Sequence, residues 1–413
     1  MSILDQLFPL SRQMVQRLNQ PYRRYVMEQQ PFSARCTILT GQRGVGKTTC
    51  LIQHLLEIDS DYETSRSSLY LPVDHFLVGR SSLYEIASDF SNQGGKLLCL
   101  DEVHKYLSWS RDLKSIIDTF PQLKIVASGS SMLHLHRGTH DLSRRALLIK
   151  LEGLSFREFL ELRWNMKLPV LSLETILEKH EKKAPALGKA VEAQGSTIIG
   201  EFHRYLESGF YPYSKEYRDL KSFQATLEQS MHTAIESDLT ALHPNLTGTS
   251  VARIKRLLSA IAEAVPYTPD LTQLRKLLHV SDDRTLKDYL QYLEDAGLIM
   301  MIHRSGKKFR SLEKPDKIYL GDPNQNMALA SYDHADRGTL RETFFCRALL
   351  AKHSVAVAER GDFLIDEETV IEVGGSSKGS HQITGIPKAF LALDNLPVGV
   401  GKRVPLWLFG FLY

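Results

Sequence analysis

The chain has 413 residues, of which 43% are hydrophobic and 24% are charged, and its formal net charge is +3. This length exceeds an ordinary domain of ~100–200 residues and predicts two to four domains, and the composition is that of a soluble globular protein. The nearly balanced charge neither requires nor excludes a nucleic-acid partner, because a local basic face can be hidden in a balanced total.

The N-terminus lacks the basic leader and apolar core of a signal peptide. No stretch approaches the ~20 apolar residues that a membrane span requires. The four cysteines are scattered without a CxxC pair, which is typical of buried thiols in a reducing compartment. We therefore expect a cytoplasmic protein.

Short apolar strands alternate with amphipathic helices in the first 155 residues. Helical patterns are clearest at Thr48–Ile58 and Ser108–Phe120. The predicted strands are Cys36–Thr40, Ser68–Val73, Leu97–Asp101, Lys124–Ser128 and Ala146–Leu151. Each is largely apolar, as a strand buried on both faces should be. The alternation predicts an α/β fold with a parallel sheet and right-handed crossovers.

The strand signal fades after residue 155. Helices are expected at Phe156–Leu162, Leu171–Lys183, Ile199–Leu206 and Leu220–Leu242. Three more are expected at Val251–Ala264, Thr272–Leu278 and Arg284–Ala296, followed by an apolar strand near residues 298–303. This second group has the pattern of a winged helix. The last segment returns to mixed α/β, with strands at Lys317–Leu320, Ser354–Ala358, Phe363–Ile365, Val370–Val373 and Leu406–Leu412.

A phosphate-binding loop is predicted between the first strand and the helix that follows it. Residues 41–48 match the pattern GxxxxGK[ST] in the context that this motif needs. Its glycines let backbone N–H groups turn toward the phosphates of ATP, and the helix N-terminus favours the anion. Lys47 would meet the β- and γ-phosphates, and the Thr48 hydroxyl would ligate Mg²⁺. The predicted nucleotide-binding residues are Gly41, Gln42, Arg43, Gly44, Val45, Gly46, Lys47, Thr48 and Thr49.

Two carboxylates follow the third predicted strand. Asp101 would hold the metal directly or through water, as a Walker B acid does. Glu102 is placed to polarise a water for attack on the γ-phosphate. Together with Lys47, the pair predicts hydrolysis rather than binding alone.

Further polar side chains are expected beside the γ-phosphate. The fourth strand ends in a run of hydroxyls at residues 128–131, from which Ser130 would orient the attacking water. The alternative for this run is a turn that caps the next segment. Arg144 or Arg145, just before the fifth strand, would serve as an arginine finger in cis or from a neighbouring subunit. A surface ion pair is the other interpretation of these arginines.

The order of these motifs resembles a family of prokaryotic AAA-type ATPases with a C-terminal domain of restriction-endonuclease-like fold. Residues 151–159, Leu-Glu-Gly-Leu-Ser-Phe-Arg-Glu-Phe, are close to a signature of that family, and residues 371–375 and 405–410 also look like its closing stretch. The resemblance spans roughly residues 20 to 413. It implies a sheet in the AAA strand order, then a winged helix, and a nuclease-like module last.

The resemblance also implies a second acidic site. In a PD-(D/E)xK nuclease, carboxylates hold one or two Mg²⁺ ions and a lysine steadies the nucleophile. Glu342, Asp362 and Glu372 match the carboxylates of this pattern, but Gly374 stands where the lysine should be. We expect Gly374 to face the carboxylates and Lys378 to point elsewhere, which would leave a fold that binds without cutting. The alternative is that Lys378 folds back and substitutes.

The winged helix has its own candidates for DNA contact. The basic side chains are Arg275, Lys276, Arg284 and Lys287, with a basic tip at residues 306–310. Nearby aspartates dilute this charge, so packing within the chain is the alternative role.

The sequence thus predicts four regions, namely a P-loop ATPase core at 1–155, a helical region at 156–245, a winged helix at 246–312 and a nuclease-like domain at 313–413. The leading hypothesis is an AAA-type ATPase that couples the nucleotide state to a DNA or protein partner, with ATP and Mg²⁺ bound. The alternatives are a Mg²⁺-dependent DNA nuclease licensed by ATP, and a nucleotide-bound scaffold with negligible turnover. An oligomer is compatible with each hypothesis.

Overall fold

The structure is a computed structural model, and it describes residues 2–29, 32–129, 142, 144–243, 245–305, 314–329 and 336–413. It divides into two compact units, Met1–Glu152 with Thr240–His243, and Gly153–Leu239 with Pro244–Tyr413. Within the described ranges, no helix is long and apolar enough to cross a membrane. All four cysteines are buried and outside any disulfide, as the sequence predicts.

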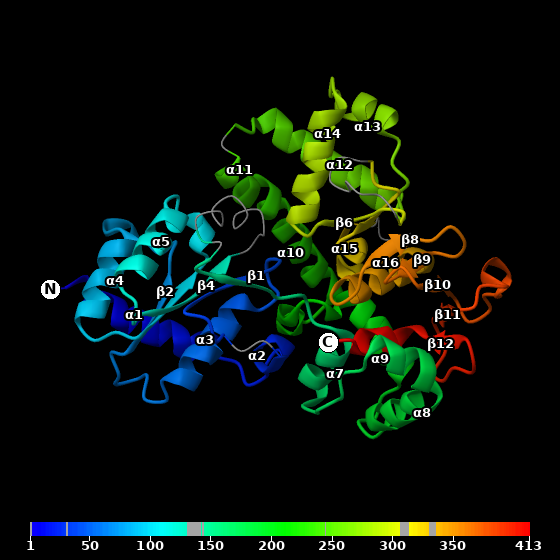
Figure 1. Cartoon of the computed structure of the whole chain (residues 1–413), viewed down its shortest axis with the longest axis horizontal. Coiled ribbons are helices and arrows are strands. Elements are labelled where there is room, and N and C mark those ends of the chain that lie inside the picture. The colour runs from blue at the N-terminus through cyan, green and yellow to red at the C-terminus, as the bar shows by residue number, and fades with distance from the viewer. Residues whose placement is uncertain are drawn as a thin grey trace. The chain divides into compact units, whose positions relative to one another are not determined.

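The first unit is built on a parallel five-stranded sheet (Figure 1). Its strands are β1 (Cys36–Thr40), β2 (Ser68–Pro72), β3 (Leu97–Asp101), β4 (Lys124–Gly129) and β5 (Leu147–Lys150). They are arranged in the order β2-β3-β4-β1-β5. The predicted α/β fold with a parallel sheet is therefore confirmed, and the predicted strand ends are correct to within one residue.

Helices and short 3₁₀ turns connect these strands. They are α1 (Ile3–Leu18), α2 (Tyr25–Gln29), α3 (Lys47–Ile58), η1 (Val78–Arg80), α4 (Leu83–Asn92), η2 (Val103–Lys105) and α5 (Trp109–Thr119). Capping boxes at Ser2 and Ser82 begin α1 and α4, and the N–H of each serine donates to the carboxylate three residues later, Asp5 or Glu85.

Both faces of this sheet are covered, which explains the continuous apolar runs of its strands. Side chains such as Leu69 and Leu71 of β2 belong to one core with residues of α1, α4 and α5. Strand side chains alternate between the two faces of a sheet. Tyr70, between Leu69 and Leu71 on β2, and Cys99 on β3 therefore point to the opposite face from this core. There, the Cys99 thiol lies 4.0 Å from the carbonyl of Leu51 on α3.

The second unit begins with a helical stretch and continues into three further helices. Its helices and turns up to residue 295 are α7 (Phe156–Trp164), α8 (Leu173–Glu192), α9 (Ile198–Arg204), η3 (Tyr205–Gly209), η4 (Pro212–Glu216), α10 (Leu220–Thr233), η5 (Ala234–Asp238), α12 (Gly248–Glu263), α13 (Leu271–Leu278) and α14 (Asp283–Asp295). The short helix α11 (Leu239–Leu242) falls almost wholly in the segment 240–243 that is assigned to the first unit. Asp270 and Asp282 cap α13 and α14 through their side chains.

The signature-like run at 151–159 has a packing role in this unit. Ser155 caps α7 with a capping box, and Phe156 is fully buried. The Phe156 ring meets Phe202 at 5.3 Å and Trp407 at 6.5 Å between ring centroids. A Cβ on Gly410 would lie 2.4 Å from the Phe156 Cβ, so the closing stretch of the chain packs directly on this helix.

Two antiparallel strands, β6 (Ile299–Ile302) and β7 (Lys317–Leu320), follow α14. An isolated bridge joins Tyr267 to Ile318 at the same small sheet. The sequence placed Lys317–Leu320 in the last region, and in the structure this strand pairs with β6.

The last segment forms a mixed sheet in the order β12-β11-β10-β9-β8. Its strands are β8 (Val355–Val357), β9 (Phe363–Ile365), β10 (Thr369–Gly374), β11 (Ala389–Leu393) and β12 (Arg403–Pro405). β9 is antiparallel to both of its neighbours, whereas β10, β11 and β12 run parallel. The accompanying helices are α15 (Pro323–Leu329), α16 (Arg337–Leu350), η7 (His381–Ile383) and η8 (Leu406–Phe411).

One predicted strand of this segment is wrong. Residues 406–411 form the 3₁₀ helix η8 instead, and every residue of η8 is buried. A short run that is apolar on all sides has no periodicity that separates a strand from a buried helix. Strands β11 and β12 were not predicted from the sequence.

Candidate nucleotide site and acidic cluster

The P-loop is shaped by backbone conformations that favour glycine. Gly44 and Gly46 have φ values of 82° and 101°, a region that residues with a Cβ rarely adopt. A Cβ on Gly41 would lie 2.3 Å from the backbone oxygen of Leu151. The loop is therefore seated against the segment that follows β5, and α3 begins directly at Lys47.

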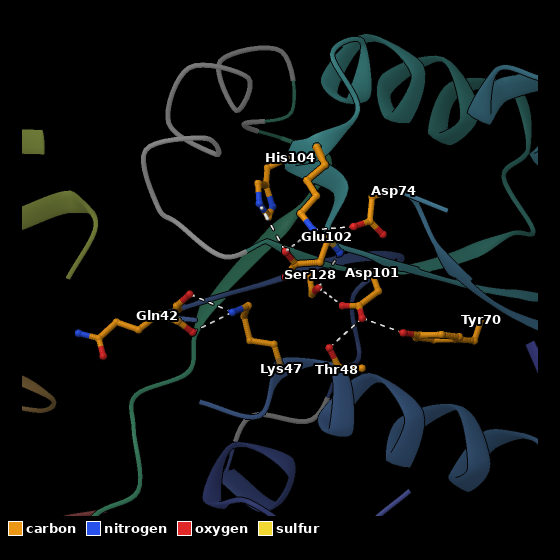
Figure 2. Close-up of polar contacts among 11 residues, drawn as sticks. Gln42, Lys47, Thr48, Tyr70, Asp74, Asp101, Glu102, His104 and Ser128 are labelled. Atoms are coloured by element: carbon orange, nitrogen blue, oxygen red, sulfur yellow. Dashed lines mark hydrogen bonds and ion pairs between the residues drawn. The ribbon is translucent and has the colours of Figure 1, made fainter. Parts of the chain in front are cut away.

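Lys47 is held at the mouth of this loop. Its Nζ donates to the carbonyl oxygens of Gly41 at 3.1 Å and Gln42 at 2.8 Å. Lys47 is only 5% exposed. Hydrogen bonds to the protein, such as these two, therefore take the place of contacts with bulk water at its ammonium group. Figure 2 shows the Gln42 side chain pointing away from Lys47, which leaves the backbone of Gln42 as the contact.

Asp101 lies at the carboxyl end of β3 among three hydroxyl groups (Figure 2). Its Oδ2 accepts from Thr48 Oγ1 at 2.7 Å and from Tyr70 OH at 2.7 Å. Its Oδ1 accepts from Ser128 Oγ. Burial raises the pKa of Asp101, while the hydroxyl donors, led by Ser128, act in the opposite direction.

These contacts form a donor set suited to a hard cation. The Thr48 hydroxyl and the Asp101 carboxylate bring two oxygen atoms within 2.7 Å of each other beside the P-loop. Mg²⁺ is usually bound through one or two carboxylates and the phosphates of its substrate. The residues present therefore fit a Mg²⁺ ion held together with a nucleotide.

Glu102 has an uncommon backbone conformation. Its φ is 58°, which is unusual for a residue with a Cβ, and its N–H donates to Ser128 Oγ at 3.0 Å. Its Oε2 lies 3.6 Å from both His104 Nε2 and Lys105 Nζ. Burial, with Lys47 as the next largest cause, lowers the pKa of His104 to about 3. The His104 ring is therefore neutral at pH 7, and Lys105 is the cation of this group.

In the second unit, Glu342 and Asp362 approach one lysine. Lys317 Nζ lies 3.6 Å from Glu342 Oε2 and 4.0 Å from Asp362 Oδ1. Glu342 Oε2 also accepts from Tyr319 OH at 2.7 Å, and Asp362 Oδ2 accepts from the N–H of Val373 at 2.8 Å. Burial and the nearby charge of Asp362 raise the pKa of Glu342.

The expectation that Lys378 points elsewhere is wrong. Lys378 Nζ lies 2.8 Å from Oε1 of the fully buried Glu372. A Cβ on Gly374 would lie 2.8 Å from both Cβ and Cγ of Lys378. The Lys378 stem thus crosses directly over Gly374, because glycine leaves room for it. The Gln382 amide, oriented to donate, lies 2.8 Å from the same oxygen of Glu372.

The predicted second metal site is not formed by these side chains. In the described part of the chain, no group of three His, Cys, Asp or Glu residues is arranged to hold a metal ion. Lys317 and Lys378 lie beside the carboxylates of Glu342, Asp362 and Glu372.

Comparisons with known proteins agree with the P-loop geometry. Residues 33–160 match the family model of the AAA domain. This stretch is similar to an AAA domain, and it contains the P-loop. Residues 199–334 match a domain of unknown function (DUF8612).

Three similar proteins place these matches in context. The uncharacterized protein MJ1637 of Methanocaldococcus jannaschii is 26% identical over 398 residues, which cover 89% of this chain and 81% of that protein. The Walker-type ATPase PABY2304 of Pyrococcus abyssi has 15% identity and a TM-score of 0.40, covering 73% of this chain and 93% of that one. AMPPCP-bound DnaA from Aquifex aeolicus has 12% identity and a TM-score of 0.26, covering 70% and 88%. Neither solved structure is similar enough to transfer a function.

Arg24 contacts the P-loop, although no motif in the sequence indicated it. It is buried, and it donates to the carbonyl oxygen of Val45 in the P-loop and to that of Glu152 at 2.8 Å. It therefore ties the P-loop to the end of the first unit. The only sequence signal was the basic pair that it forms with Arg23.

Three further residues, Arg144, Arg145 and Ser130, were predicted to lie beside the γ-phosphate. Arg145 forms a two-pronged ion pair with Asp118, with N···O distances of 2.8 and 3.0 Å. This corresponds to the ion-pair alternative for Arg145, whereas Arg144 is exposed. Ser130 lies outside the described residues.

The basic residues predicted to contact DNA are only partly free to do so. Arg275 Nε lies 3.0 Å from Asp283 Oδ1, so its charge is compensated within the segment. Lys276 and Arg284 are exposed, and Lys287 is half-buried. The predicted basic tip at residues 306–310 lies outside the described residues.

Proposed function

We propose that this protein binds and hydrolyses ATP at the P-loop of its AAA domain, and that the nucleotide state acts as a switch toward a DNA or protein partner. The observation that carries the proposal is the meeting of Lys47, Thr48, Asp101 and Glu102 at one edge of the sheet. The Thr48–Asp101 hydrogen bond of 2.7 Å supports it most directly.

Each residue has a separate part in this reaction. Backbone N–H groups of the P-loop and the N-terminus of α3 bind the phosphates, and Lys47 turns its ammonium group from the loop carbonyls to the β- and γ-phosphates. Thr48 and Asp101 would hold Mg²⁺, which supplies neutralisation of the phosphate charge. Glu102 accepts a proton from water as the water oxygen bonds to the γ-phosphorus. The bond to the bridging oxygen breaks, giving ADP and phosphate.

Two substitutions test binding and chemistry separately. Glu102→Gln keeps the size of the side chain but removes the base, so kcat should fall ~10²–10⁴-fold while a fluorescent ATP analogue still binds. Lys47→Ala should weaken that binding. Glu63→Gln, at an exposed glutamate of the same unit, is the matched control and should change neither. Unchanged turnover in Glu102→Gln would refute the assignment of the base.

A scaffold that binds ATP without turnover is the main alternative for this site. The αL backbone of Glu102, held by Ser128, favours the hydrolytic function, because such a conformation costs free energy and needs a compensating contact. Tight ATP binding with no measurable phosphate release would favour the scaffold.

A nuclease licensed by ATP is a second candidate, favoured by one observation. Lys378 reaches Glu372 across Gly374, so a lysine stands beside the carboxylate although the expected position lacks one. The order of β8 to β12 and the neighbouring α16 are compatible with the nuclease-like module. DNA cleavage with ATP and Mg²⁺ or Mn²⁺ that is lost in Asp362→Ala and in Lys378→Ala would establish this function. The absence of cleavage under conditions of ATP hydrolysis would leave a binding role.

The proposal also includes a winged helix at residues 246–312, the four regions predicted from the sequence and a cytoplasmic location. It is compatible with an oligomer. Helices α12–α14 followed by the β6–β7 hairpin support a winged helix. If this region binds DNA phosphates, affinity should fall steeply with salt, and Lys287→Glu should weaken it. A gel shift without a salt-sensitive complex would favour a packing role.

A further inference from the structure

The carboxylate of Asp101 uses most of its capacity to accept hydrogen bonds. An ionised carboxylate has about four lone-pair positions. Three of them are taken by the hydroxyls of Thr48, Tyr70 and Ser128. Thr48 and Ser128 belong to α3 and β4, whereas Tyr70 belongs to β2. Because β3 lies between β2 and β4, Tyr70 reaches Asp101 from the side opposite to Ser128 (Figure 2).

Tyr70 is itself held in place by helix α1. Its N–H donates to Ser11 Oγ at 2.9 Å, and its carbonyl oxygen accepts from the same hydroxyl at 2.6 Å. The hydroxyl of Tyr62 also meets Ser11 Oγ. β2 is an outer strand of its sheet, so Ser11 satisfies backbone groups that a further strand would otherwise pair with. The Tyr70 side chain therefore starts from a backbone that is held at both of its hydrogen-bonding groups.

The hydroxyl of Tyr70 is not needed for packing. Tyr70 is 1% exposed, and a phenylalanine would fill nearly the same space without burying a polar group. Burial of a hydroxyl costs free energy unless the hydroxyl is hydrogen-bonded. The bond of 2.7 Å to Asp101 Oδ2 meets this requirement, and it places a second donor on the oxygen that accepts from Thr48. The contact with Asp101 is thus what the hydroxyl adds to the ring.

We propose that Tyr70 is a positioning residue for the cation that accompanies the nucleotide. Tyr70 and Thr48 together occupy Oδ2 of Asp101, and Ser128 occupies one lone pair of Oδ1. The remaining lone pair is on Oδ1, which is therefore the atom that Asp101 offers to Mg²⁺ or to a water bound to it. The inference rests on the proposed nucleotide and Mg²⁺ site. Removing a hydrogen-bond partner of a ligating carboxylate typically lowers metal affinity ~10–100-fold.

The test is Tyr70→Phe in the full-length protein, with a fluorescent ADP analogue as the probe. In EDTA, the affinity for the analogue should equal that of the wild type, because the phosphates bind to the P-loop and not to Asp101. When Mg²⁺ is titrated, its half-saturating concentration should rise about tenfold, at the lower end of the range because Thr48 and Ser128 keep their bonds to Asp101. A role in the fold alone would instead weaken binding of the analogue in EDTA as well.

Tyr62→Phe is the matched control. It removes the same atom from another buried tyrosine, whose hydroxyl meets Ser11 rather than Asp101. It should leave the half-saturating Mg²⁺ concentration at the wild-type value, even where thermal unfolding shows that the hydroxyl contributes to stability.

Three results would overturn the inference and leave nucleotide binding standing. These are an unchanged Mg²⁺ requirement in Tyr70→Phe, an equal rise in Tyr62→Phe, and a loss of affinity in EDTA together with a lower unfolding midpoint in Tyr70→Phe. A wild-type affinity that does not respond to Mg²⁺ would have the same consequence. If the wild-type protein bound no analogue in either condition, the proposed function would fail together with the inference.

Discussion

Asp322 offers a test of the second unit that is independent of any ligand. It follows β7 and is fully buried. Its Oδ2 accepts from Tyr211 OH at 2.7 Å, and its Oδ1 accepts from the N–H of Gln325 at 3.1 Å. These donors lower its pKa, but burial outweighs them and raises the pKa of Asp322 from 3.8 to about 7. The perturbation we consider is Asp322→Asn, which removes the titration and keeps the size.

The sign of the effect follows from proton binding. Between pH 3.8 and about 7, the folded protein binds more protons at Asp322 than the unfolded chain does, so the free energy of unfolding falls as pH rises through this interval. It levels off above about pH 7. The free energy of unfolding falls by at most about 4 kcal/mol over this interval, because a pKa shift of one unit is worth ~1.4 kcal/mol. Wild type should thus lose stability at this group between pH 5 and pH 8, whereas Asp322→Asn should not.

Thermal unfolding measured across this pH range checks the prediction. Subtracting the midpoint of Asp322→Asn from that of the wild type removes the titration of all other groups. This difference should fall by several degrees from pH 5 to pH 8, since 1 kcal/mol corresponds to ~2–4 °C for a unit of this size. Asp288→Asn, at an exposed aspartate of α14, is the control and should give a flat difference. A flat difference for Asp322→Asn as well would refute the reasoning.

Three further substitutions test the contacts around the two units. Gly41→Ala should lower the affinity for a fluorescent ATP analogue at least ~10-fold, because its Cβ would lie 2.3 Å from a backbone oxygen that cannot move aside. Arg24→Met removes the two hydrogen bonds to backbone carbonyls that brace the P-loop and should also weaken this binding; unchanged affinity would contradict the brace. Phe156→Ala should destabilise the second unit by ~3–5 kcal/mol in thermal or denaturant unfolding, with ATP binding retained; a loss below ~1 kcal/mol would show that its ring contacts are dispensable.

The sequence predicted the P-loop and the sheet because both are encoded in local patterns. Strands buried on two faces are continuous apolar runs, and glycines mark the backbone conformations that a phosphate cradle needs. Asp101 could be selected because it ends such a run. Its partner Tyr70 could not, because a tyrosine in an apolar strand is equally compatible with the core, and only the alternation of β2 directs it to Asp101.

Contacts between distant segments were beyond the reach of local patterns. Arg24 meets Glu152 across 128 positions of the chain, and nothing near either residue indicates the pairing. The apolar run at 406–411 was assigned the wrong element because its burial is complete. Helices α13 and α14, in contrast, were predicted to within one residue at each end, since both have aspartate caps and amphipathic spacing.

The Gly374 position shows how a missing residue can mislead. In the nuclease sequence pattern a lysine is expected at position 374, so the glycine there indicates a loss of nuclease activity. In space, the Lys378 stem lies within 2.8 Å of where a Cβ at 374 would be, and its Nζ lies 2.8 Å from Glu372. A side chain at position 374 would overlap the stem of Lys378. The Lys378–Glu372 contact therefore depends on glycine at this position. Gly374→Ala should therefore displace Lys378 and leave the buried Glu372 carboxylate without its cation, which costs far more than the added methyl group alone.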